Sequence, residues 1–401
     1  MYKAVCFRSL ASIVLLSGAI SVRAHALERV PEIKSAIDDA DLVALRGNVH
    51  PLARADFETG TAPPDLAMTS MMLVLSRSSD AEAALQKLID SQQNPASSNY
   101  HQWLTPEQVG EQFGVADADI QTVTSWLASY GFQVNRISKS KTVIEFSGTA
   151  SQVQAAFHTE IHRYLVNGIE HWANATNPQI PRALASVVAG VATLHNFVKS
   201  PQMAAAGQQF EAIASPNSQP QFTSSSGTHA LAPGDYATIY NINPVYQNGI
   251  TGANVVIAVV GRTNIRVSDV TSFRSAFALT PNDPQIVVNG ANPGDLGGSE
   301  EAEAVLDTEW AGAVAPGATV KLVVSKTTAS ADGVDLSEEY IIDNNLGDVM
   351  TESFGDCEAN YTSAQASFYS SLAEQAAAQG ITYLVASGDS GAMGCDSGSE
   401  T

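Results

Sequence analysis

The chain has 401 residues, a formal net charge of −21 and 44% hydrophobic residues. This length favours two or three domains, and the hydrophobic content is typical of globular folding. The acidic excess would repel nucleic acid and anionic membranes, which argues against binding to either. Lys and Arg are scarce after Leu231, so this part gains little positive charge in acid. That suits work at low pH, although ordinary solubility explains the same composition.

Residues 1–26 have the pattern of a secretory signal peptide. A basic start precedes an apolar run over 10–22, and Ala24-His25-Ala26 fits a small-x-small cleavage site. The run is too short to span a membrane. We therefore expect a secreted, extracellular protein with no membrane contact after cleavage, rather than one held by an uncleaved anchor.

The segment over 27–198 predicts a compact unit of mixed helices and strands. The elements are, in chain order, a strand over 71–76, helices over 80–90, 105–113 and 120–130, strands over 132–137 and 142–146, a helix over 151–157 and a strand over 160–166. Helix 120–130, for example, carries Val123, Trp126 and Leu127 on one face. The order β-α-β-β-α-β favours a ferredoxin-like α+β domain.

Residues 199–229 have the composition of a linker. They are rich in Ser, Gln, Ala, Pro and Gly and lack a periodic apolar pattern. We expect this segment to be exposed and open to proteolysis, with a mature chain that starts near 225–235.

Residues 230–401 predict an α/β unit with a parallel sheet. Strands are expected over 255–260, 319–324, 347–351 and 381–386, and helices over 269–277 and 364–379. The first of these strands is a continuous apolar run, as buried parallel strands are. The last runs directly into Asp389, and catalytic groups of open parallel sheets lie at the carboxyl ends of strands.

Glu303 and Asp307 are the first candidates for chemistry. They lie four residues apart on an expected helix with Ser299 as its N-cap, which puts both carboxyls on one face. Two such carboxyls share protons, so one of them can act as a base at a pH where histidine is charged. No histidine follows His229, which removes the usual base for a serine nucleophile. A solvated acidic helix start would show the same spacing.

Asp389 allows three interpretations. Asp389-Ser390-Gly391 is similar to the nucleophile motif of chymotrypsin-like proteases, but the surroundings are α/β and the histidines all come earlier. A protonated Asp389 could instead donate a hydrogen bond to an oxyanion. A plain turn after a strand is the third interpretation.

Two cysteines remain once Cys6 leaves with the signal peptide. Cys357 and Cys395 both lie in loops that follow expected strands, and neighbouring parallel strands bring such loops together. In an exported protein this pair favours a disulfide.

Four segments resemble the sedolisins, the serine-carboxyl peptidases of the kumamolisin type. They are HQWLTPEQVGEQFG (101–114), ATIYNINPVYQNGITGANVVIAVV (237–260), EAVLDTEWAGAVAPGA (303–318) and VASGDSGA (385–392). The resemblance implies an activation prodomain that inhibits its own enzyme, followed by a subtilisin-like catalytic domain that cleaves proteins or peptides in acid. It implies that Glu303 is the base, Asp307 its partner and Asp389 the oxyanion donor.

The chain departs from the family pattern at three places. Ser353-Phe354-Gly355 stands where the family has Ser-Trp-Gly, and Gly261 or Arg262 stands where some members have a further Glu. The family's Gly-Thr-Ser-x-x-x-Pro nucleophile motif and its calcium loop are expected beyond Thr401. We therefore expect a C-terminally truncated precursor, itself inactive, with no metal ligands in this chain.

Two alternatives and one further expectation belong to this interpretation. A prodomain with part of a catalytic domain could act as a non-catalytic binding or inhibitory protein. A histidine-dependent subtilisin is disfavoured, because its histidine should lie in this half of the catalytic domain. We expect the protein to be a monomer.

Overall fold

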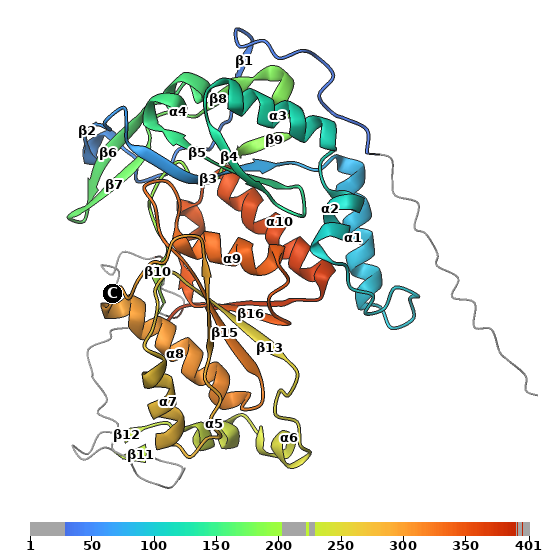
Figure 1. Ribbon diagram of the computed structural model, residues 1–401, viewed down its shortest axis with the longest axis vertical. Helices are drawn as coiled ribbons and strands as arrows, with labels where there is room; N and C mark the ends of the chain where they lie inside the picture. The colour runs from blue at the N-terminus through green and yellow to red at the C-terminus, as the bar shows by residue number, and fades with distance from the viewer. Residues whose placement is uncertain (1–28, 203–221, 224–228, 390, 392–394, 396–401) are drawn as a thin grey trace, which may run out of the picture.

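The computed structural model describes residues 29–202, 222–223, 229–389, 391 and 395. Figure 1 shows two α/β units stacked along the long axis of the molecule, with the N-terminal unit at the top and the parallel-sheet unit below it. The predicted signal peptide, most of the predicted linker and Ser390 lie outside the described residues.

The N-terminal unit is built on a four-stranded antiparallel sheet in the order β4-β5-β3-β9. The strands are β3 (Ala67–Leu75), β4 (Gln133–Ile137), β5 (Val143–Thr149) and β9 (Val188–Val191). The helices are α1 (Ser79–Gln93), α2 (Pro106–Phe113), α3 (Asp117–Ser129) and α4 (Ala150–Phe157). Helix α2 begins as the sequence predicts, because Thr105 and Gln108 form a capping box and Pro106 occupies the first turn.

The predicted strand over 160–166 exists, but its predicted place in the main sheet is wrong. It is β6 (Ile161–Val166), which lies in a separate three-stranded sheet between β2 (Glu58–Thr61) and β7 (Ile169–Asn174). The fourth strand of the main sheet is β9, which pairs with β3. An alternating apolar pattern marks a half-buried strand, but it does not specify which strand is its partner.

The second unit is a parallel sheet in the order β14-β15-β13-β16-β18. The strands are β13 (Val256–Gly261), β14 (Gln285–Asn289), β15 (Thr319–Ser325), β16 (Val349–Glu352) and β18 (Thr382–Val385). Helices α7 (Val267–Ala276) and α8 (Gly298–Val314) cover one face, and α9 (Gly333–Asp343) and α10 (Ser363–Gln379) cover the other. The expected parallel α/β sheet is therefore confirmed, although α9 and β14 were not predicted.

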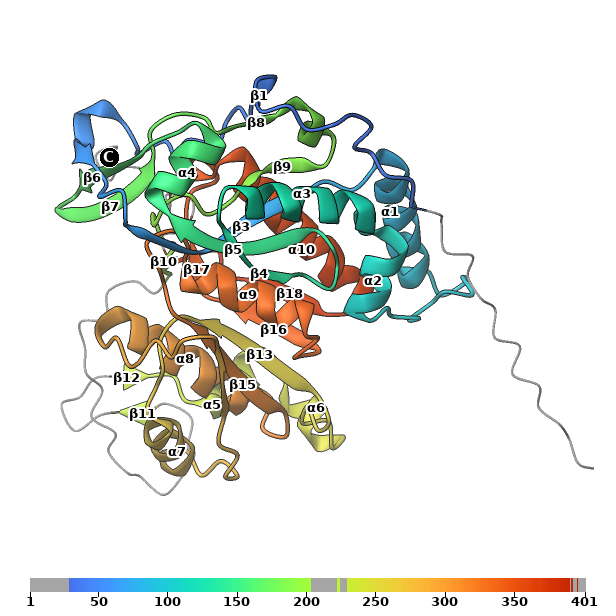
Figure 2. The same ribbon diagram turned by 45° about the horizontal axis from the view of Figure 1, so that its top comes forward.

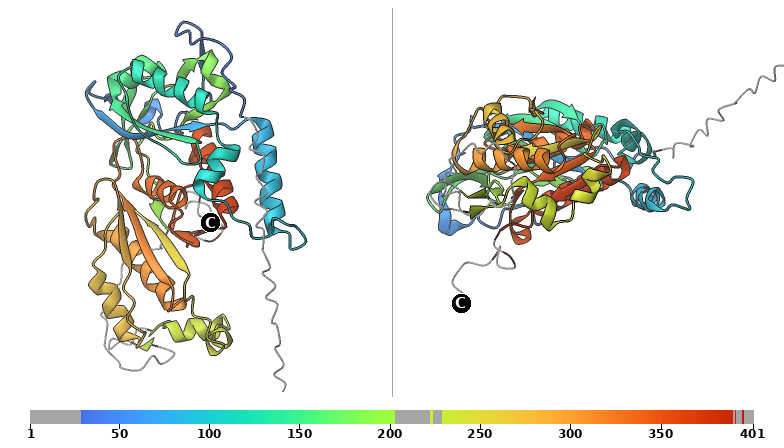
Figure 3. Two further views of the ribbon diagram at one scale, coloured as in Figure 1. Left: turned by 45° about the vertical axis from the view of Figure 1, so that its right-hand side comes forward. Right: turned by 90° about the horizontal axis from the view of Figure 1, so that it is seen from below.

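The two units meet through α9 and α10, which lie between the two sheets (Figures 2 and 3). Met72, Val74 and Val143 of the N-terminal sheet share one apolar cluster with Phe368 and Leu372 of α10. Because these side chains are all nearly inaccessible to water, the interface is packed like a domain interior.

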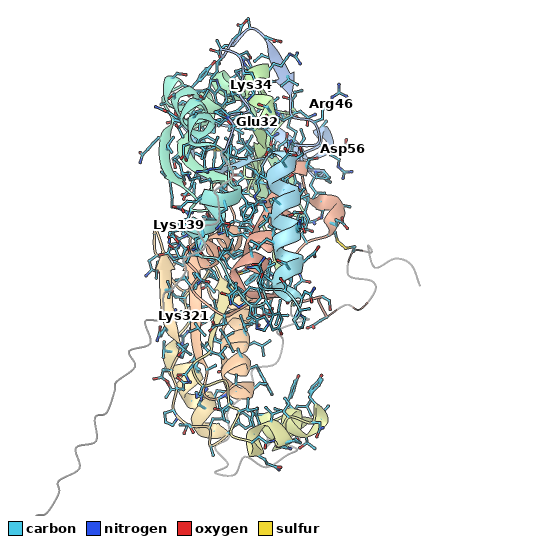
Figure 4. The ribbon with its side chains drawn as sticks, turned by 90° about the vertical axis from the view of Figure 1, so that its right-hand side faces the viewer. Glu32, Lys34, Arg46, Asp56, Lys139 and Lys321 are labelled. Atoms are coloured by element: carbon cyan, nitrogen blue, oxygen red, sulfur yellow. A yellow bond between two sulfur atoms is a disulfide. The ribbon has the colours of Figure 1, made fainter. Side chains whose placement is uncertain are left out.

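Charged groups surround this apolar contact. Arg136 of β4 pairs with both Glu339 and Asp343 of α9, and Arg77 pairs with Glu374 of α10 at 2.7 Å. Lys139 lies at the junction of the two units (Figure 4), where its backbone N–H donates to Asp343 Oδ1 at 2.7 Å. Two cations of the N-terminal unit, Arg77 and Arg136, thus pair with carboxylates of the second unit.

Shorter elements complete the described chain. They are β1 (Leu42–Ala44), β8 (Gln179–Pro181), β10 (Ser200–Pro201), β11 (Phe222–Thr223), β12 (His229–Ala230), β17 (Phe354–Gly355), α5 (Pro233–Ile239) and α6 (Asn243–Gln247), with 3-10 turns at Ala55–Phe57, Arg182–Ser186 and Glu358–Asn360. Over the described ranges, no helix combines the length and apolar character needed to cross a membrane.

Candidate active site

Helix α8 carries both predicted acidic residues. It starts at Gly298 with Gly297 as the N-cap, so the prediction that Ser299 caps it is wrong. Gly297 has a positive φ of 66°, a conformation that glycine adopts without strain, and no side chain caps the helix. One turn separates Glu303 from Asp307; the first is buried and the second half-buried. The expected shared face therefore points into the protein rather than into solvent.

Asp307 accepts a hydrogen bond from a serine that lies just after strand β16. Ser353, which follows β16, donates its Oγ–H to Asp307 Oδ1 at 2.7 Å. The second oxygen, Oδ2, is buried and has no hydrogen-bond partner among the described residues. Burial, opposed by the Ser353 hydrogen bond and reinforced by the neighbouring charge of Glu303, raises the pKa of Asp307 to about 7. In mild acid Asp307 is therefore protonated.

A protonated Asp307 changes what Glu303 can do. Two like charges one helical turn apart repel each other, so a proton on Asp307 removes the repulsion that opposes ionisation of its neighbour. Two carboxyl groups this close can share one proton, and their titration then belongs to the pair. A pair that shares one proton can supply a carboxylate base in acid, where histidine would be charged, which is the role that the sequence predicts for Glu303.

The residues that follow the N-terminal unit lie along the second unit and contact the helix that carries Glu303 and Asp307. Strand β10 pairs antiparallel with β17, with Ser200 opposite Gly355 and Pro201 opposite Phe354. The next residue, Gln202, donates its backbone N–H to the carbonyl of Ser353 at 2.9 Å. Strand β10 also contacts α8. The start of the predicted linker is therefore docked on the second unit instead of lying free.

Gln202 also touches the segment that carries Asp389. A Cβ atom placed on Gly388 would lie 2.6 Å from Gln202 Oε1, so this side chain and the glycine are in close contact. Asp389 follows Gly388 directly, four residues beyond β18, and its side chain is exposed. Because β18 runs parallel beside β16, the loops that carry Ser353 and Asp389 leave the same edge of the sheet. Gln202 bridges them.

Arg262 directly follows β13, at the predicted departure over Gly261 and Arg262. It is buried and forms ion pairs with Glu300 at 2.6 Å and Asp332 at 2.9 Å. Its guanidinium lies 5.2 Å from the centre of the Phe354 ring. The Arg262 side chain therefore links the start of α8 to the start of α9 through two ion pairs. It adds no further carboxyl group to Glu303 and Asp307.

A cavity of about 720 Å³ opens beside the docked strand. Its lining includes Lys199, Gln202, Glu352, Tyr369 and Ser387. The predicted disulfide is confirmed at its rim, where Cys357 and Cys395 have Cα atoms 5.6 Å apart. Figure 4 shows this bond in yellow.

Sequence reasoning missed the residues around Lys199. Its ammonium is buried among carboxylates of the second unit, although composition assigned it to an exposed linker. No local signal in the sequence marks this contact, because the partners lie more than a hundred residues away. The described residues contain no group of three or more His, Cys, Asp or Glu suited to hold a metal ion.

Comparisons with known proteins match both units. A family model described as "Pro-kumamolisin, activation domain" matches residues 57–197. Sedolisin from Pseudomonas sp. (strain 101) is 27% identical over 355 residues, which cover 85% of this chain and 58% of the relative. Tripeptidyl-peptidase 1 from Canis lupus familiaris is 29% identical over 324 residues, which cover 78% of this chain and 54% of the relative. The chain thus spans a little over half the length of these two relatives.

One solved structure also matches part of the chain. Pseudomonas sedolisin, described as a serine-carboxyl proteinase "complexed with two molecules of pseudo-iodotyrostatin", has 27% identity and a TM-score of 0.31, over 36% of this chain and 42% of that chain. The family assignment does not depend on this partial match. The family model and the two relatives support a sedolisin-family precursor, whose residues 57–197 match an activation domain.

Proposed function

We propose that the protein is the precursor of a secreted serine-carboxyl endopeptidase that hydrolyses peptide bonds in acid. The observation that carries this proposal is the set of contacts around Ser353. Its side chain binds Asp307, its carbonyl binds Gln202, and Gln202 touches Gly388. The carboxyl pair and the segment that carries Asp389 thus flank one extended peptide strand.

The proposed chemistry assigns one role to each carboxyl group. A serine expected beyond Thr401 attacks the substrate carbonyl, and Glu303 accepts its proton and returns it to the leaving amine. Asp307, protonated in acid, donates a hydrogen bond that orients Glu303. A protonated Asp389 donates to the oxyanion that forms on the carbonyl oxygen.

The docked linker is the proposed means of inhibition. Peptide substrates commonly add a strand to an exposed edge by backbone hydrogen bonds, and β10 already makes such bonds to β17. While Lys199–Gln202 occupy this edge, no substrate can do so. Release would follow cleavage in the linker, with the mature start that we predict near 225–235.

The finer fold assignments are part of the same proposal. The antiparallel order β4-β5-β3-β9, with two helical connections, supports a ferredoxin-like prodomain over 27–198. The parallel sheet with helices on both faces supports a subtilisin-like catalytic domain over 230–401. We further propose a monomer that binds calcium through residues beyond Thr401.

Product analysis tests the reaction class. The natural protein that contains this chain would be processed at about pH 4 and given peptides with free or acetylated N-termini. An endopeptidase cleaves both kinds internally, whereas a tripeptidyl peptidase, the activity named for one relative, releases three residues from free N-termini alone. Absence of hydrolysis in acid would contradict the proposal.

A further inference from the structure

The ammonium group of Lys199 lies in a cage of three carboxylates. Its Nζ is 2.8 Å from Glu352 Oε1, 3.1 Å from Asp335 Oδ1 and 3.3 Å from Glu338 Oε2. Side-chain exposure is 7% for the lysine and at most 5% for each carboxylate, so water does not screen these pairs. The cage therefore holds a desolvated primary ammonium ion.

Two tyrosines complete the cage. The Tyr369 ring lies 4.3 Å from the ammonium, a cation–π contact, and its hydroxyl donates to Asp335 at 3.0 Å. The Tyr383 hydroxyl lies within hydrogen-bond distance of Glu338 Oε1 and of Glu352 Oε2, the latter at 3.1 Å, and the two carboxyl groups share its single O–H. Each carboxyl group therefore has a tyrosine partner besides the lysine. Its orientation does not depend on the ligand alone.

All of the walls belong to the second unit. Asp335 and Glu338 lie on α9, Glu352 on β16, Tyr369 on α10 and Tyr383 on β18. The ligand alone comes from outside, because Lys199 begins the predicted linker. When the linker leaves, the walls stay with the catalytic unit, and three carboxylates lose the cation that compensates them. An emptied site of this kind either takes up protons or binds another cation, so its affinity for a cation increases with pH.

The position of the cage along the docked strand is defined by hydrogen bonds. The backbone N–H of Lys199 donates to Asp332 Oδ2 at 2.8 Å, and three residues later the N–H of Gln202 donates to Ser353 at 2.9 Å. A peptide that replaced the linker in this register would place its own side chain in the cage, next to the cavity of about 720 Å³.

We propose that the cage formed by Asp335, Glu338 and Glu352 is a substrate subsite for a lysine side chain. The lysine is the third residue N-terminal to the residue whose N–H binds Ser353. This inference rests on the proposed function, because it requires a peptide substrate in the place of β10.

Selectivity for lysine depends on how many cage groups are ionised. Burial raises the pKa of Asp335 to about 6 and that of Glu338 to about 8, and Lys199 opposes both shifts. The other groups that face the ammonium are Glu352, Tyr361, Tyr369 and Tyr383. Preference for lysine over a neutral side chain of similar shape should therefore increase from about pH 4 to pH 7.

Amine rescue tests the cage in this chain without any need for activity. Lys199→Ala removes the four side-chain atoms beyond Cβ, for which n-propylammonium is the matching probe. We expect the probe to raise the melting temperature of Lys199→Ala by at least about 2 °C and to leave the wild type unchanged. If Lys199→Ala does not fold unaided, a gain in refolded protein with the amine is the same result.

Three controls separate a specific site from a general salt effect. Propanol has the same shape without charge, Lys139→Ala removes a lysine that lies outside the cage, and Lys199→Ala with Glu352→Gln weakens the cage. None of the three should show rescue. Equal effects of amine and propanol, or no effect of the amine on stability or refolding, would overturn the proposal.

Peptide cleavage tests the subsite itself. The processed natural protein would be given paired peptides with lysine or norleucine at the third residue before the one that binds Ser353. We expect kcat/KM to be about tenfold higher for lysine near pH 6, and Glu352→Gln to reduce this ratio. Cleavage of both peptides at one rate would refute the subsite alone, whereas no cleavage of any peptide would refute the proposed function.

Discussion

At the scale of single residues, Asp307 shows how position in the fold changes the pKa of a carboxyl group. Its spacing from Glu303 could be predicted from the sequence, since four residues make one helical turn. Its hydrogen bond to Ser353 could not, because 46 residues separate the two positions. That bond and the burial of Oδ2 distinguish a paired site from the solvated acidic helix start that the sequence also allowed.

The raised pKa of Asp307 predicts a pH-dependent effect of Asp307→Asn. A folded pKa near 7 against 3.8 for the free group means that ionisation costs stability as the pH rises from about 4 to 7. Asparagine avoids that cost and can still accept from Ser353. We expect Asp307→Asn to raise the free energy of unfolding by about 2–4 kcal/mol at pH 8 and by little at pH 4, measured by urea denaturation.

The matched control is Asp56→Asn, which changes an exposed aspartate of the N-terminal unit, labelled in Figure 4. Asp56→Asn should change the free energy of unfolding by the same amount at pH 4 and at pH 8. A variant Asp307→Asn that is less stable than the wild type at pH 8 would show that the carboxylate is stabilising there, against the account.

Asp389→Asn should reduce activity less than removal of the base. An asparagine amide donates to an oxyanion at any pH, whereas an aspartate must be protonated first. The variant should therefore retain measurable kcat/KM and extend it toward neutral pH, which a pH–rate profile would show. A loss as complete as that of Glu303→Gln would argue against Asp389 as the oxyanion donor.

At the scale of elements, the composition of helix α9 explains why neither this helix nor the cage around Lys199 was predicted. Nearly all of its residues are buried, including the acidic ones, so the helix lacks the polar face on which periodicity analysis depends. Its carboxylates are buried because cations from far along the chain, Arg136 and Lys199, reach them. By contrast, α2 and α10 have complete N-terminal capping boxes, which can be recognised from residues three positions apart in the sequence.

A cluster of histidines in the N-terminal unit predicts acid sensitivity of that unit. The His50 ring stacks on Phe197 with centroids 4.0 Å apart and lies 4.8 Å from the ring of His195. The Leu52 N–H donates to His50 Nδ1 at 3.2 Å, so that nitrogen cannot carry a proton without breaking the bond. Burial, with the charges of His195 and His171, lowers the pKa of His50 from 6.5 to about 2.

A lowered histidine pKa contributes stability above pH 6.5 that is lost as the pH falls toward 2. We expect His50→Phe, which preserves the stacking, to recover about 2–3 kcal/mol of unfolding free energy at pH ~4.5 relative to pH 7. Chemical denaturation at the two pH values measures this, with His162→Gln on β6 as the control. An unchanged pH dependence in His50→Phe would exclude this residue as a source of acid lability.

At the scale of the whole molecule, the sequence did not predict how the N-terminal unit and the parallel-sheet unit fit together. Strands, helices and the parallel sheet follow from apolar patterns and turn residues, which are local. The packing of β3 and β5 on α10 and the docking of Lys199–Gln202 join segments more than a hundred residues apart. Such contacts form the candidate site, because Gln202 of the predicted linker connects the loops that follow β16 and β18.

The central claim is that Glu303 is the base of an acid-acting peptidase. The most direct test measures hydrolysis of an acetylated peptide at about pH 4 by the processed natural protein as wild type, Glu303→Gln and Glu301→Gln. Glutamine keeps the shape of Glu303 but cannot accept the proton, and Glu301 is a control on the first turn of the same helix. The account predicts a loss of about 10²–10⁴ in kcat for Glu303→Gln alone, with both variants folded. Wild-type turnover by Glu303→Gln would contradict it.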